Sequence, residues 1–163
     1  MKRLFFILLF FSTLFLFGCA HSEYGILEYQ NNDITAVCTV NGKYNVSITK
    51  RKDYSALVIN EPSEVSGVCF ELFSDGAFVS IDNVTIPIEE SKLSGICALI
   101  GIFDLDESEL TSTTAKNGES LFVFSNGYGT YNVIFGQNSM PQSVQLTNGV
   151  YTFDVTIESI SLE

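Results

Sequence analysis

The sequence predicts a mostly β protein of the α+β class, a curled antiparallel half-barrel of about 10–11 strands with one helical segment across its concave face. Apolar and polar residues alternate along most of the chain after position 33. Two-residue turn signals, such as Asn41-Gly42 and Asn148-Gly149, separate the alternating segments. Only the segment around residues 92–110 changes to a helical spacing.

The first half of the domain is predicted to contain six strands joined by short turns. Ile34, Ala36 and Cys38 have the same parity and are expected to face the core. Pro87 has no N–H to donate, so the last of the six strands is expected at a sheet edge. The six predicted strands cover residues 34–40, 44–49, 54–59, 68–73, 77–81 and 84–88.

A helix is expected over residues 92–103, where apolar residues recur at spacings of three and four. Gly95 and Gly101 weaken this helix, and residues 104–110 are expected to add a short further turn. Strands follow again at 120–124, 128–135, 141–146 and 150–160. A sheet of this many strands must curl, and the helix is the available cover for its concave face.

The chain opens with Lys2 and Arg3, and an uncharged run follows from Leu4 to Phe17. This pattern predicts a secretory signal peptide over residues 1–18, because the run is shorter than the ~20 residues that a membrane-spanning helix needs. Leu16-Phe17-Gly18-Cys19 resembles the lipobox of bacterial lipoproteins. The resemblance implies a diacylglyceryl group on Cys19, a tether over residues 19–24, and attachment to the extracytoplasmic face of the membrane. An uncleaved N-terminal anchor is the alternative.

The residues after position 18 carry nineteen acidic and six basic side chains, a formal charge of −13. Such a surface repels phosphate backbones, so nucleic-acid binding is not expected. Lys50-Arg51-Lys52 is the only basic cluster, and we interpret it as the solvated tip of a turn.

The sequence offers little material for catalysis or for a metal site. His21 is the only histidine, which argues against a Ser-His-Asp triad, and no C-x-x-C spacing occurs. We therefore predict a non-enzyme without a cofactor or metal. Cys38, Cys69 and Cys97 are expected to be buried free thiols, although one disulfide with a leftover thiol is also compatible with the sequence.

Several segments follow one another in a characteristic order after residue 25: the Pro62–Gly67 loop, Cys69-Phe70-Glu71, the Ser74-Asp75-Gly76 turn, Val84-Thr85-Ile86-Pro87-Ile88, Met140–Leu146 and Asn148-Gly149. This order of elements resembles that of the LolA/LolB-like carriers and the LppX-type lipoproteins. The resemblance implies a single half-barrel domain over residues 25–163 with helices across its mouth. This chain has fewer helices, so we expect a reduced lid.

The sequence is compatible with two functions. The domain either binds a hydrophobic ligand, such as an acyl chain or lipid, on the concave face, or it has a solid core and binds an envelope protein through its acidic surface or a sheet edge. Leu93, Ile96, Ile100 and Phe103 are the expected ligand cover. Nine aromatic side chains on the predicted strands either pack in the protein core or line a ligand cavity: Phe70, Phe73, Phe78, Phe122, Phe124, Phe135, Phe153, Tyr131 and Tyr151. An open apolar pocket of several hundred Å³ would favour ligand binding.

Overall fold

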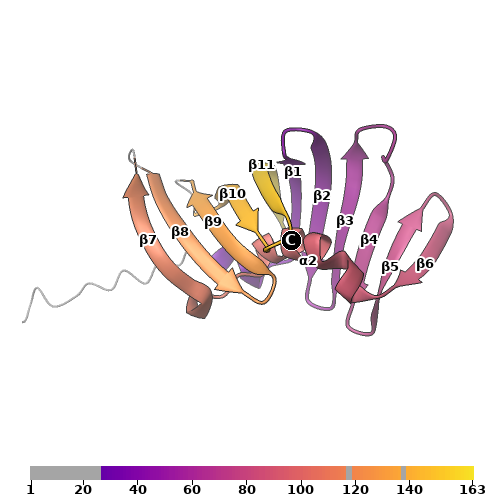
Figure 1. Cartoon of the computed structure of the whole chain (residues 1–163), viewed down its shortest axis with the longest axis horizontal. Helices are drawn as coiled ribbons and strands as arrows, with labels where there is room; N and C mark the ends of the chain where they lie inside the picture. Colours follow the sequence, from indigo (N-terminus) through magenta and orange to yellow (C-terminus); the bar gives the residue numbers. More distant parts are fainter. Residues whose placement is uncertain (1–26, 117–118, 137–138) are drawn as a thin grey trace, which may run out of the picture.

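A computed structural model describes residues 27–116, 119–136 and 139–163. These residues form one open antiparallel sheet of eleven strands, in the order β6-β5-β4-β3-β2-β1-β11-β10-β9-β8-β7 (Figure 1). The predicted fold class and the predicted curled sheet are confirmed. The strands are β1 Ile34–Val40, β2 Tyr44–Arg51, β3 Tyr54–Glu61, β4 Cys69–Phe73, β5 Gly76–Ile81, β6 Val84–Ile88, β7 Leu110–Lys116, β8 Glu119–Asn126, β9 Gly129–Phe135, β10 Pro141–Thr147 and β11 Thr152–Leu162.

The first six strands lie side by side in chain order, from β1 at the centre of the sheet to β6 at one edge. Each is joined to the next by a short connection, and all six were predicted from alternation and turn signals. Asn41 and Gly42 both have positive φ, 53° and 62°, as a two-residue hairpin turn requires. β6 contains Pro87 and forms an edge of the sheet, so the predicted edge position is confirmed.

The second half of the sheet is joined to the first by the pairing of β11 with β1. The register shifts between Val37 and Cys38, where a bulge lets Ile157 and Ile160 both face the core side. The opposite edge is formed by β7, a strand that the sequence pattern did not predict. Its sequence, LTSTTAK, has no apolar alternation, and it forms a strand because threonine suits a half-exposed extended backbone.

The predicted helix over residues 92–103 is broken into three short pieces. A 3₁₀ turn, η2 Glu90–Leu93, leads into the α-helix α2 Ser94–Ile100, and a second 3₁₀ turn, η3 Gly101–Phe103, follows. The expected further turn is η4 Glu107–Glu109, which begins with a capping box between Asp106 and Glu109. One more 3₁₀ turn, η1 Glu28–Asn31, was not predicted.

The core lies between the concave face of the sheet, against which α2 packs at β2 and β3, and the segment from α2 to Leu105. Phe103, Ile102 and Ala98 are completely buried in it. Gly101 is required at its position, because a Cβ there would lie 2.7 Å from the hydroxyl oxygen of the buried Tyr131 on β9. The glycine that weakens the helix therefore lets the helical segment approach the sheet closely.

Residues 1–26 lie outside the described part of the chain. The predicted signal peptide, the lipidated Cys19 and the tether therefore remain predictions. Within the ranges that the structure describes, no helix is long and apolar enough to cross a membrane.

Candidate functional site

The four residues expected to cover a ligand all lie on the helical segment and contact the sheet. Ile100 and Phe103 are buried in the main core, with 5% and 0% of their surface exposed. Leu93 belongs to a second, smaller apolar cluster, which also contains Cys97 and Ala77. Ile96 is half-buried and contacts both clusters. Their role as a ligand cover remains a prediction, but their placement divides the concave face into a covered part and a less covered part.

The less covered part is the concave face of β4, β5 and β6, which we call the wing. Phe70 of β4 pairs with Val79 of β5, and Val79 pairs in turn with Ile86 of β6. Directly paired residues point to the same side of a sheet, so the pairing assigns each side chain to a face. The wing residues are Phe70, Leu72, Ala77, Val79, Ile81, Val84, Ile86 and Ile88.

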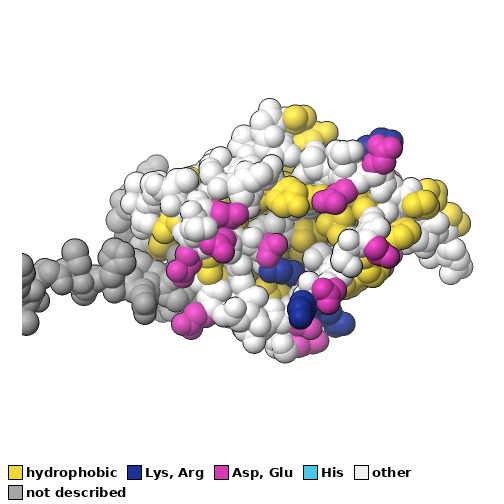
Figure 2. Space-filling model, turned by 90° about the horizontal axis from the view of Figure 1, so that it is seen from below, with side chains coloured by type: hydrophobic (Ala, Val, Ile, Leu, Met, Phe, Trp, Pro, Cys, Tyr) yellow, Lys and Arg dark blue, Asp and Glu magenta, His cyan; other side chains and the backbone are white. Residues whose placement is uncertain are grey.

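Exposure of the wing residues increases along the strands, from the helical segment toward the β5–β6 turn. Ala77 is 4% exposed beneath Leu93 and Cys97. Ile81, Val84 and Ile86 are 45%, 57% and 58% exposed. Figure 2 shows hydrophobic side chains gathered at the end of the molecule that carries β5 and β6, with acidic side chains beside them. An exposed group of large apolar side chains on one face is typical of a binding surface.

A hollow of about 570 Å³ lies beside the wing, between the β2–β3 turn, the β4–β5 turn and α2. Its lining is mixed, because polar residues such as Asn31 and Asp104 share it with Leu72, Phe73 and Ile100. The hollow has the volume expected for a ligand pocket, but it lacks the predominantly apolar lining of such pockets. The covered part of the concave face is therefore a packed core, and the accessible apolar surface is the wing.

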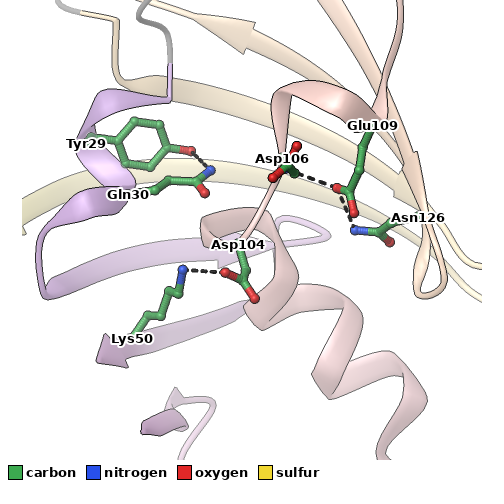
Figure 3. Close-up of polar contacts among 7 residues, drawn as sticks. All are labelled: Tyr29, Gln30, Lys50, Asp104, Asp106, Glu109 and Asn126. Atoms are coloured by element: carbon green, nitrogen blue, oxygen red, sulfur yellow. Dashed lines mark hydrogen bonds and ion pairs between the residues drawn. The ribbon is translucent and has the colours of Figure 1, made fainter. Parts of the chain in front are cut away.

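An ion pair fixes the end of the helical segment to the sheet. Lys50 of β2 donates to Asp104, with 2.5 Å between Nζ and Oδ1, and its side chain is only 18% exposed (Figure 3). The interpretation of Lys50-Arg51-Lys52 as a wholly solvated tip was therefore wrong for Lys50. Asp104 lies 54 positions away in the sequence, so no local pattern indicates this pairing.

The next turn of the segment is held by a second set of contacts. Glu109 accepts a hydrogen bond from Asn126 Nδ2 at 3.1 Å and another from the Asp106 backbone N–H at 3.2 Å (Figure 3). Asn126 stands at the end of β8, so this contact joins η4 to the second half of the sheet. The helical cover is thus tied to both halves of the sheet.

The three cysteines of the described chain are free thiols, as expected, but the expected burial was wrong for Cys69, which is only half-buried. Cys38 is completely buried, and burial raises its pKa from 9.0 to about 12, with the nearby Glu158 carboxylate adding to the shift. Burial also raises the pKa of Cys97, which is 5% exposed. Neutral, buried thiols of this kind act as small apolar side chains. No cluster of metal-ligating side chains occurs among the residues that the structure places.

The strand aromatics divide between the core and the surface. Phe122, Phe124 and Tyr131 are buried, in agreement with the core interpretation. Phe73 and Tyr151 are 42% and 50% exposed, so the core interpretation does not hold for these two. Phe73 lies on the face of β4 opposite to the wing, where its ring centroid is 5.0 Å from that of Tyr54.

The chain matches no protein-family model and no curated protein. Similar solved structures include an uncharacterized conserved protein from Thermus thermophilus, with 10% identity, coverage of 88% of each chain and a TM-score of 0.51. A LolA superfamily protein from Nitrosomonas europaea has 11% identity, 85% and 92% coverage of this chain and its own, and a TM-score of 0.45.

A further similar structure is the Mycobacterium tuberculosis lipoprotein LppX, with 13% identity, coverage of 86% of this chain and 100% of LppX, and a TM-score of 0.38. Both groups that the sequence resembles, the LolA superfamily and LppX, occur among these similar structures. At these identities the similarity concerns the fold alone.

Proposed function

We propose that this protein is a non-catalytic binding domain that holds an elongated apolar ligand against the wing. The observation that carries the proposal is the uncovered row of Ile81, Val84 and Ile86, which continues the apolar face of the sheet beyond the helical cover. Removing apolar surface from water contributes about 25 cal/mol per Å², so a ligand that covers these side chains gains affinity from them. Leu93 and Ile96 form the inner wall of this surface.

The predicted lipid on Cys19 places this binding domain at a membrane surface, on the extracytoplasmic side. Two acyl chains suffice for stable anchoring, because each buried CH₂ contributes roughly 0.8 kcal/mol. A domain held close to the bilayer would encounter apolar ligands at high local concentration. An acyl chain and an apolar peptide segment both present the elongated apolar surface that the wing requires.

A titration with a fluorescent long-chain fatty acid tests the proposal on the anchor-free domain, residues 25–163, once circular dichroism has shown that it is folded. We expect saturable binding to the wild-type domain. Binding to the Val84→Thr/Ile86→Thr variant should be at least about tenfold weaker, because the ligand would then have to bury two hydroxyl groups without hydrogen-bond partners. Threonine keeps the β-branched shape, so the strand is retained.

Val150→Thr is the matched control. Val150 is the most exposed large apolar residue of the described chain, at 77%, and it lies before β11, outside the wing. Its substitution should leave the affinity unchanged. Equal affinities for the wild-type domain and the wing variant would show that the wing is not the binding surface, and unsaturable uptake by all three would exclude an acyl chain as its ligand.

A further inference from the structure

The wing is wide enough for one helix. Its three strands span two inter-strand spacings, about 10 Å between the axes of β4 and β6. An α-helix with its side chains is about 10–12 Å across, and helices in contact pack about 8–10 Å apart. A helix laid on the wing would therefore lie beside α2 and cover Ile81, Val84 and Ile86, which α2 leaves exposed.

Addition of a strand at the sheet edge is the less suitable way of binding here. An incoming strand needs a regular row of backbone donors and acceptors along β6. Pro87 lies within β6, and a proline in an edge strand places its missing N–H on the outer side. The row is interrupted at that position, so the free face of the wing, rather than its edge, is the docking surface.

The charges around the wing select the kind of partner. Residues 53–91 contain eight acidic side chains and no lysine or arginine. Glu61 ends β3, Glu64 lies in the loop after it and Asp82 lies in the turn from β5 to β6, which places all three at one end of the wing. At the other end, Asp75, Glu89 and Glu90 lie near Lys92, which pairs with Glu89, and near the basic β2–β3 turn, whose Lys52 lines the same hollow as Glu90.

An apolar strip with three carboxylates at its β5–β6 turn end attracts cations there and repels anionic groups. Anionic lipid head groups and free fatty acids therefore fit this surface less well than a positively charged partner does. A second copy of this chain, with a net charge of −11, is repelled as well.

We propose that the ligand of the wing is a cationic amphipathic helix of a partner protein, with an apolar stripe against Ile81, Val84 and Ile86 and basic residues toward Glu61, Glu64 and Asp82. This inference rests on the proposed function, because it names the class of ligand that the same surface binds. The helix takes the position beside α2 and completes the cover of the concave face.

The test uses the full lipidated protein in phosphatidylcholine nanodiscs and a labelled helical peptide of about 18 residues with one leucine stripe and lysines along both sides of it. A second peptide has glutamate in place of every lysine, and a third has a central proline that breaks the helix. Fluorescence anisotropy is measured for each peptide, with protein-free nanodiscs as the background. The protein variants are Val84→Thr/Ile86→Thr and Glu64→Gln/Asp82→Asn, with Val150→Thr as the control.

We expect the lysine peptide to bind at least about tenfold more tightly than the other two peptides, because like charges repel and the broken helix loses its stripe. Both double variants should weaken its binding, and Val150→Thr should not. The inference is overturned if the glutamate peptide binds as tightly as the lysine peptide. It is also overturned if the proline peptide binds as tightly as the lysine peptide. Fatty-acid binding at the wing without peptide binding also overturns it and leaves the proposed function standing, whereas a wing that binds neither rejects both.

Discussion

At the scale of single residues, Cys38 shows how burial sets the chemistry of a side chain. Its thiol is completely enclosed on the core side of β1, and burial raises its pKa from 9.0 to about 12. The thiolate is the reactive form of cysteine, so this side chain is inert at neutral pH. Its contribution to the fold is the volume that it fills in the main core, beside its strand partner Val46.

The raised pKa of Cys38 makes stability depend on pH in the alkaline range. The folded state holds the thiol proton more tightly than the unfolded chain does, so the stabilisation is complete below pH 9 and is lost as the pH rises toward 12. We expect the free energy of unfolding of the wild-type protein to fall more steeply between about pH 9 and pH 11 than that of Cys38→Ala. Urea denaturation at several pH values measures both slopes.

Cys69→Ala is the control for this comparison, because Cys69 is only half-buried, although burial raises its pKa as well. Its substitution should change the pH dependence less than Cys38→Ala does. Parallel pH profiles for the wild-type protein and Cys38→Ala would contradict the burial of this thiol on the core side of β1.

At the scale of elements, the helical segment is the part of the chain that decides which surface of the sheet is accessible. Truncation of Phe103 to alanine should lower the free energy of unfolding by about 3–5 kcal/mol, because its ring is completely buried in the main core. Phe73→Ala, on the opposite face and 42% exposed, should cost much less. Urea unfolding of both variants gives the comparison, and an equal loss in the two would mean that the segment does not cover the sheet.

The elements differ in how far the sequence could predict them. Ten strands are indicated by alternation or by turn signals, because each has one face in contact with other apolar groups. β7 was missed because an edge strand rich in threonine and serine has no apolar period. The helical pieces were located but predicted as one helix, since the close approach of Gly101 to Tyr131 depends on a strand that follows much later in the chain.

The candidate site was harder to predict than the fold, for a physical reason. The apolar alternation of Val84 and Ile86 resembles that of Ala36 and Cys38, yet the first pair is exposed and the second is completely buried. The difference arises from where the segment 94–103 lies on the sheet. Sequence periodicity shows which side chains share a face, but it does not show which part of that face is covered.

At the scale of the whole molecule, the pairing of β1 with β11 turns two sets of hairpins into one sheet with a single continuous concave face. The short helical cover occupies the centre of that face, and Lys50–Asp104 and Asn126–Glu109 fix it to both halves. The wing extends beyond this cover, and three carboxylates lie at its β5–β6 turn end. The covered core and the wing, our proposed binding surface, are therefore successive parts of one face of the sheet.

The predicted lipid anchor would set the location of the wing in the cell. The seven residues between Cys19 and Leu27 span at most about 25 Å when fully extended, so a lipid on Cys19 would hold the domain near the bilayer. Cys19→Ser should abolish incorporation of a labelled fatty acid and leave a precursor that is not cut at this site. Metabolic labelling and the apparent mass of the protein in the producing cells measure both effects. Cys69→Ser is the matched control and should label normally; fatty acid retained on the Cys19→Ser protein would refute the lipobox interpretation.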